Sequence, residues 1–169
     1  MNRTALAVVA VAVIALAGCS GVPGAGSDGT GTDPGVDVES NDTGATNVTQ
    51  SVVIEVEETA EGEELSAIGA TYPRDRFTVR AAQHDQIGIG VDSDGDGEVE
   101  RRFNETNISG VNNNAYSFDV TLDTGYALSS GDTVVVEYPA VDNPTESGQY
   151  TVGTRLNDRP AANATVAIG

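Results

Sequence analysis

Five acidic residues occupy every second position of one short, glycine-containing segment: Asp92, Asp94, Asp96, Glu98 and Glu100. Gly97 permits a tight backbone turn, so side chains at alternating positions can converge on one side of a loop. Carboxylate oxygens are hard ligands that suit Ca²⁺ at 2.3 to 2.6 Å. The segment therefore predicts a calcium site, although Asp-Gly pairs also form hairpin turns that hold no metal.

The first six residues of this segment resemble the start of an EF-hand loop, but its twelfth position is Phe103 instead of a bidentate Glu. No flanking helices are apparent. The segment looks more like the D-x-D-x-D-G-x-x-D calcium hairpins of extracellular β proteins, with strands that end at Val91 and begin at Val99. That resemblance implies a structural site of weak affinity, with the backbone carbonyl of Glu98 as one ligand. Its side-chain ligands would be Asp92, Asp94, Asp96 and Glu100.

Residues for other chemistry are scarce. His84, the one histidine, follows a predicted strand, and no G-x-S-x-G nucleophile motif accompanies it. We interpret it as an exposed or hydrogen-bonded loop residue. Zinc and copper centres need several His or Cys ligands, which this chain lacks. A glycosidase pair of carboxylates stays open in so acidic a chain, but no aromatic sugar platform is apparent. We predict no catalytic residue and no enzyme.

The elements that must position the acidic segment are strands, because apolar residues recur with period two. The clearest strand covers residues 116–122, where Tyr116, Phe118, Val120 and Leu122 share one face. Further strands are predicted within residues 52–56, 77–81, 87–91, 133–138, 149–156 and 165–168. Turn residues separate them, and the triplet Asn112–Asn114 is predicted to be a loop. Seven or more short strands without a helical period indicate an antiparallel β-sandwich; residues 57–68 allow a short helix or an acidic loop.

One stretch makes the sandwich more specific. Residues 146–152, Glu-Ser-Gly-Gln-Tyr-Thr-Val, resemble the acid-x-Gly-x-Tyr-x-Cys stretch that opens strand F of immunoglobulin-like domains. The resemblance implies that the Tyr150 hydroxyl bonds back to the backbone near the corner. Val152 stands where antibody domains have Cys, and the chain has no Trp, so their disulfide and its packing partner are missing. We expect an all-β, antiparallel, immunoglobulin-like sandwich.

The N-terminus has the pattern of an export signal. Arg3 precedes an apolar run over residues 4–17, which ends in Leu16-Ala17-Gly18-Cys19. This ending resembles the lipobox of prokaryotic lipoproteins, and the resemblance implies that Cys19 is lipidated and becomes the new N-terminus. At 1.5 Å per residue, the run extends about 21 Å as a helix, short of the roughly 30 Å hydrocarbon core. We predict a signal peptide over residues 1–18 and a membrane partner through the lipid on Cys19.

Residues 19–50 are rich in Gly, Ser, Thr, Asp and Asn, a composition that buries too little apolar surface to fold. We therefore predict a disordered tether over 19–50 and the sandwich domain over 51–169. Asn-x-Ser/Thr triplets are glycosylation acceptors in exported chains, although Asn- and Thr-rich sequence produces them by chance. The candidate acceptors are Asn41, Asn47, Asn104, Asn107 and Asn163.

The net charge of the chain excludes one class of binding partner. All eight basic residues are Arg, against 26 acids, for a net charge of −18. Such a surface excludes a phosphate-tracking nucleic-acid partner. The acidity, the absence of Lys and the lipobox are similar to exported proteins of salt-loving archaea, where molar salt screens repulsion between carboxylates.

Two functions of different classes remain open. The first is a non-enzymatic, lipid-anchored module on the extracellular face of the membrane, which acts in binding or envelope structure and has surface proteins or glycans as partners. The second is a small accessory enzyme or substrate-capturing lipoprotein beside a transporter. A single sandwich of about 120 residues lacks the two-lobe cleft common in capture proteins, which favours the first.

Overall fold

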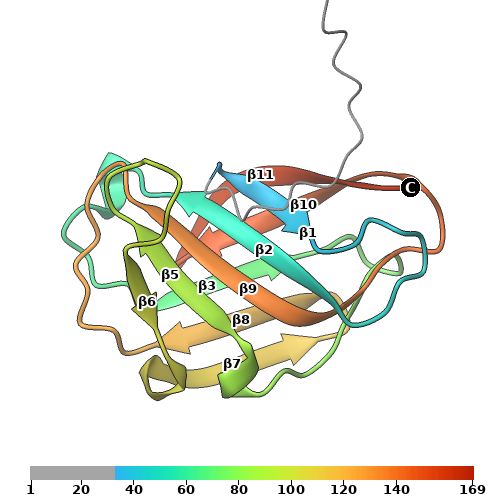
Figure 1. Cartoon of the computed structure of the whole chain (residues 1–169), viewed down its shortest axis with the longest axis horizontal. Coiled ribbons are helices and arrows are strands. Elements are labelled where there is room, and N and C mark those ends of the chain that lie inside the picture. The colour runs from blue at the N-terminus through green and yellow to red at the C-terminus, as the bar shows by residue number, and fades with distance from the viewer. Residues whose placement is uncertain (1–32) are drawn as a thin grey trace, which may run out of the picture.

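The structure, a computed structural model, describes residues 33–169, which form two antiparallel sheets packed face to face (Figure 1). The helical segments of these residues are three short 3-10 turns: η1 (Glu58–Ala60), η2 (His84–Gln86) and η3 (Glu105–Asn107). The predicted antiparallel β-sandwich is confirmed.

The first sheet has six strands in the order β1-β2-β9-β5-β6, and β4 also pairs with β9. Its strands are β1 (Gly35–Val38), β2 (Val48–Glu55), β4 (Thr78–Val79), β5 (Gly88–Asp92), β6 (Arg101–Phe103) and β9 (Thr133–Asp142). Pro139 lies within the central strand β9, between Glu137, where pairing with β5 ends, and Val141, where pairing with β4 begins. Because proline has no N–H for a ladder bond, it is accommodated at this gap between two partner strands.

The second sheet has five strands in the order β11-β10-β3-β8-β7. They are β3 (Ala67–Thr71), β7 (Ile108–Asn114), β8 (Ser117–Leu122), β10 (Gly148–Leu156) and β11 (Arg159–Ile168). The core between the sheets is mainly aliphatic, and its aromatic part is centred on Phe118 and Tyr138. These two rings stack with centroids 4.1 Å apart, one from each sheet. They join the layers without a disulfide.

The corner predicted from the immunoglobulin resemblance is present. The hydroxyl of Tyr150 in β10 donates a hydrogen bond to the carbonyl of Glu146 at 2.7 Å. Its ring also packs edge-on against Phe77 at 5.4 Å. Tyr150 therefore ties the start of β10 to the preceding turn, as expected.

The folded region begins earlier than the predicted boundary at residue 51. Strand β1 pairs with β2 from Gly35↔Val53 to Val38↔Gln50, and Val36 and Val48 are buried. The Val side chains scattered among Gly and Asp therefore belong to the sheet. The predicted signal peptide, Cys19 and the first part of the predicted tether lie outside the described residues.

Three other segments differ from their sequence-based limits. Residues 57–68 form the turn η1 and then enter β3, which the sequence did not predict as a strand. The asparagines at 112–114 lie in β7, because their backbone pairs with β8. Strand β11 begins at Arg159 instead of Thr165 and passes a register shift opposite Gly153–Arg155.

An ion pair between Arg80 and Asp142 stabilises the first sheet at the C-terminal end of β9. Nη2 of Arg80 lies 2.6 Å from Oδ2 of Asp142, and the backbone N–H of Asn47 donates to Oδ1 at 3.0 Å. The hydrogen bonds from Arg80 lower the pKa of Asp142 below its ordinary 3.8, although partial burial acts in the opposite direction. The Asp142 carboxylate thus joins β9 to the residue after β4 and to the entry of β2.

This bond predicts an acid-sensitive contribution to stability. Because the pKa of Asp142 is lowered on folding, its contribution is complete above the ordinary carboxyl range and is lost as pH falls through the lowered value. Asp142→Asn should therefore reduce the free energy of unfolding at pH 7 and flatten its decline towards pH 2, measured by urea unfolding. The exposed Asp85→Asn should retain the wild-type profile. An unchanged decline in Asp142→Asn would contradict the assignment.

Candidate metal site

The predicted acidic segment forms the connection between β5 and β6, at one end of the first sheet (Figure 1). We call residues 93–100 the acidic loop. Strand β5 runs to Asp92, which lies opposite Thr133 of β9, and β6 starts at Arg101. The hairpin predicted from the sequence is present, with strand limits one or two residues from those expected.

The carboxylate of Asp92 fixes the backbone conformation of the acidic loop through hydrogen bonds. Its side chain is fully buried, Oδ1 accepts a hydrogen bond from the N–H of Gly95 at 2.7 Å, and Oδ2 accepts one from Gly97 at 3.0 Å. Both glycines have positive φ angles of 73° and 93°, which they adopt without steric cost. The loop backbone is thereby folded around one carboxylate.

Three exposed acids of the acidic loop also accept hydrogen bonds from its backbone. Oδ1 of Asp94 accepts from the N–H of Asp96 at 3.2 Å, and Oδ1 of Asp96 accepts from Glu98 at 2.9 Å. Oε2 of Glu100 reaches back across the loop to the N–H of Ser93 at 2.8 Å. Each bond orients one carboxylate while leaving its other oxygen available.

The four predicted side-chain ligands come together. One oxygen from each of Asp92, Asp94, Asp96 and Glu100 lies within 4.8 Å of the others. Opposite ligands of an ion bound at 2.3 to 2.6 Å are about 5 Å apart, so the spacing fits a single cation. These carboxylates could therefore hold a metal ion. The side chain of Glu98 does not join the group, and the role of its carbonyl stays a prediction.

The acidic loop is held against the sheet by Val99. A Cβ on Gly90 of β5 would overlap Cγ1 of Val99 and lie 3.1 Å from the carbonyl of Arg101. Glycine at position 90 thus lets the returning limb of the loop lie directly on the strand. The loop is supported from its own hairpin, and sequence periodicity alone gave no signal of this contact.

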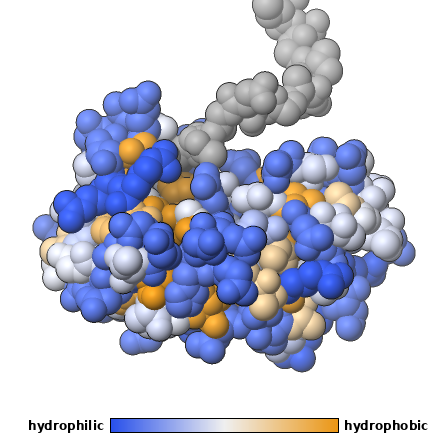
Figure 2. Space-filling view, turned by 60° about the horizontal axis from the view of Figure 1, so that its bottom comes forward, coloured by the Kyte–Doolittle hydropathy of each residue, from blue (hydrophilic) through white to orange (hydrophobic). Residues whose placement is uncertain are grey.

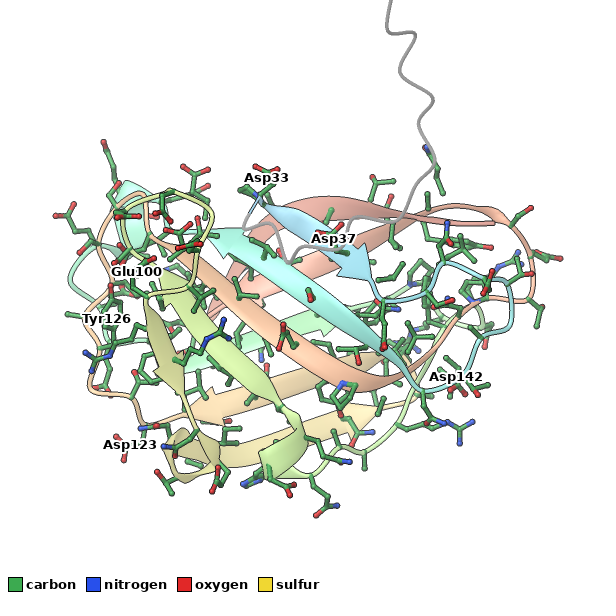
Figure 3. The ribbon with its side chains drawn as sticks, in the orientation of Figure 1. Asp33, Asp37, Glu100, Asp123, Tyr126 and Asp142 are labelled. Atoms are coloured by element: carbon green, nitrogen blue, oxygen red, sulfur yellow. The ribbon has the colours of Figure 1, made fainter. Side chains whose placement is uncertain are left out.

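An aromatic cluster supports the neighbouring strand β6. The hydroxyl of Tyr126 donates to Oδ2 of the buried Asp132 at 2.8 Å, and the Arg101 guanidinium lies 5.7 Å from the Tyr126 ring. Burial, followed by the bond to Asp132, raises the pKa of Tyr126 to about 12. Tyr126 and Glu100 lie at the same end of the sandwich, opposite Asp142 (Figure 3). The cluster positions β6 beneath the acidic loop.

The other candidate residues are not brought to this site. His84 lies exposed in η2, which agrees with its interpretation as a loop histidine. The side chain of Asn107 donates to the carbonyl of Asp123 at 3.1 Å, so its amide is already engaged. The remaining acceptor candidates are exposed: Asn41, Asn47, Asn104 and Asn163. Their glycosylation stays a prediction.

No protein-family model and no curated protein matches this chain. Solved structures resemble it at low identity. The bacterial hydrophobin BslA is 15% identical over 79% of this chain and 94% of its own, with a TM-score of 0.44. The pilus 2b backbone protein of group B streptococcus is 12% identical over 79% and 56%, with a TM-score of 0.48. An uncharacterised Nocardia farcinica protein with an immunoglobulin-like fold is 16% identical over 80% and 96%, with a TM-score of 0.39.

The packing of Val99 on Gly90 predicts a sensitive position beneath the acidic loop. Gly90→Ala should displace the returning limb, lower the free energy of unfolding by about 1 to 3 kcal/mol, and accelerate amide hydrogen exchange in residues 93–100. The matched control is Gly110→Ala in β7, where an added Cβ would lie 3.9 Å from Oγ1 of Thr121 and meet no close contact. Equal exchange in the two variants would show that Val99 does not hold the loop.

Proposed function

We propose that this chain is a non-enzymatic cell-surface module, held on the outer face of a membrane by a lipid on Cys19. It acts in binding or in envelope structure, and Ca²⁺ orders its acidic loop. The observation that carries the calcium part is the convergence of four carboxylates within 4.8 Å at the end of the sandwich. The anchor rests on the lipobox resemblance at Leu16–Cys19.

The donor set supports a hard cation such as Ca²⁺ over zinc or copper. The four side chains offer only carboxylate oxygens, and no His or Cys joins them among the described residues. Hard oxygen ligands suit Ca²⁺, whereas zinc and copper prefer nitrogen or sulfur. Without a cation, four like charges repel each other at short range. A bound ion would remove this repulsion and rigidify the acidic loop.

A structural role fits the arrangement better than a catalytic one. The loop carboxylates accept hydrogen bonds from the loop's own backbone, so they hold its shape. The one histidine, His84, lies in η2 and outside this group.

The face of the molecule drawn in Figure 2 is suited to contact with water. Figure 2 shows one face of the molecule, where hydrophilic residues dominate and apolar ones form small, scattered patches. Residues 33–169 contain no helix that is long and apolar enough to cross a membrane. The proposed membrane attachment rests on the lipobox resemblance at Leu16–Cys19.

Calcium should stabilise the folded chain. Ca²⁺ at ten times its dissociation constant adds about 1.4 kcal/mol to the free energy of unfolding, so the melting temperature should rise by several degrees. Asp94→Ala should remove the rise, because it deletes one exposed ligand without touching the buried Asp92. Glu105→Ala, an exposed acid in η3, should keep it. Coincident melting curves with EDTA and with millimolar Ca²⁺ in moderate salt would refute the calcium site.

The anchor is tested in cells. Cys19→Ser removes the only thiol that can accept a lipid, so the protein should move from the membrane fraction to the medium. The neighbouring Ser20→Ala should stay with the membrane. Continued membrane association of Cys19→Ser would show that the apolar segment over residues 4–17 is itself retained.

A further inference from the structure

A hollow of about 190 Å³ opens between the two sheets, on the side formed by β1 and β11 and next to η1. Its apolar lining comes from both sheets and from the turn: Ile54, Ala60, Leu156, Ala162 and Ala164. We call this hollow the edge groove. It lies apart from the carboxylates of the metal site, which are not among its lining residues.

The edge groove exists because β2 continues beyond the point where its pairing with β1 stops. Strand β1 pairs with β2 only as far as Gly35↔Val53, whereas β2 continues to Glu55. Within residues 33–169, the β1-facing backbone of Glu55 therefore has no strand partner, whereas the backbone of Ile54 faces β9. On the opposite sheet, β11 presents the small side chains of Ala162 and Ala164, which leave space where larger residues would close the core.

The rim of the edge groove is acidic. Glu55, Glu57 and Glu63 line it, and Arg159 is the one cation among its lining residues. The Arg159 guanidinium is already engaged, because it contacts the carboxylate of Glu63 and the carbonyl of Thr59. Glu55 and Glu57 are exposed and have no ion-pair partner within the described residues.

A further acid lies at the same end of β1. Asp33 directly precedes Pro34, which itself lines the edge groove (Figure 3). The rim therefore has a surplus of negative charge at the open end of the hollow. Positively charged groups would be attracted to it, most strongly at low ionic strength.

The size of the hollow restricts its ligand. Sites that bury drug-sized molecules measure about 300 to 1,000 Å³, so this hollow is too small for one. It can take one or two aliphatic side chains. An unpaired strand edge beside it offers backbone hydrogen bonds to an extended peptide, the mode known as β-augmentation.

We propose that the edge groove binds an extended segment of a partner protein in which aliphatic and basic residues alternate. The segment pairs with the backbone of β2 at Glu55, an aliphatic side chain fills the hollow, and basic side chains contact Glu55 and Glu57. The proposal rests on the module acting by binding, and it names the chemistry of that partner. It requires neither the lipid nor Ca²⁺.

The test uses the full chain in nanodiscs of a zwitterionic lipid, with EDTA present. The probe is a fluorescein-labelled hexapeptide of alternating Val and Arg, and binding is followed by fluorescence anisotropy. We expect saturable binding that weakens in 1 M NaCl. A hexapeptide of alternating Val and Glu should bind at least tenfold more weakly.

Two variants separate the hollow from the charge. Ala162→Phe fills the hollow and should weaken binding at least tenfold, whereas Ala167→Phe, exposed elsewhere on β11, should not. The double variant Glu55→Gln and Glu57→Gln should weaken binding about fivefold at low salt, and it keeps the test valid should Ala162→Phe fail to fold.

Several results would overturn the proposal: no binding at 1 mM peptide, equal affinity in a folded Ala162→Phe chain, or equal affinity in the double Gln variant. Equal affinity after filling would mean that the acidic surface attracts cationic peptides without a groove. Because EDTA is present and the lipid stays in place, these failures would leave the calcium and anchor proposals untouched.

Discussion

The structure depends on burying aliphatic side chains between two sheets, because the chain has no Trp and only one Cys to add to its core. Strands β8, β10 and β11 alternate buried and less buried side chains, whereas β9, in the middle of its sheet, is buried along most of its length. The stacked pair of Phe118 and Tyr138 links the two layers. The regular pairing of the strands is interrupted at two places. Pro139 lies at the gap between β4 and β5, and β11 shifts register opposite Gly153–Arg155.

The second constraint is a net charge of −18, which opposes compaction. The fold accommodates acids in two ways. A few accept hydrogen bonds inside the fold: Asp92 from the backbone N–H groups of Gly95 and Gly97, and Asp142 from the Arg80 side chain and the Asn47 backbone. The others stay exposed, where salt or bound cations can screen them. The acidic loop combines both, because a buried carboxylate organises a group of exposed ones.

Sequence patterns predicted what is local along the chain. Period-two alternation located β8 and β9, and the spacing of Asp92, Asp94, Asp96 and Glu100 predicted a group that the structure brings together. The sequence pattern did not indicate strand β1, because its Val residues stand among Gly and Asp. It did not indicate β7 either, because the Asn residues of that strand are typical of turns. Both are strands through pairing with β2 and β8, which no local pattern reveals. The edge groove likewise could not be predicted, since its residues come from β1, β2, η1, β10 and β11.

The calcium site proposed for the acidic loop is built on the buried Asp92. Isothermal titration calorimetry of the metal-free full chain with Ca²⁺ tests it most directly, with Asp92→Asn as the comparison. We expect one ion per chain, a dissociation constant in the range of about 10⁻⁴ to 10⁻³ M typical of extracellular modules, and loss of that binding in Asp92→Asn. Absence of saturable binding up to 10 mM Ca²⁺, or equal binding by Asp92→Asn, would contradict it.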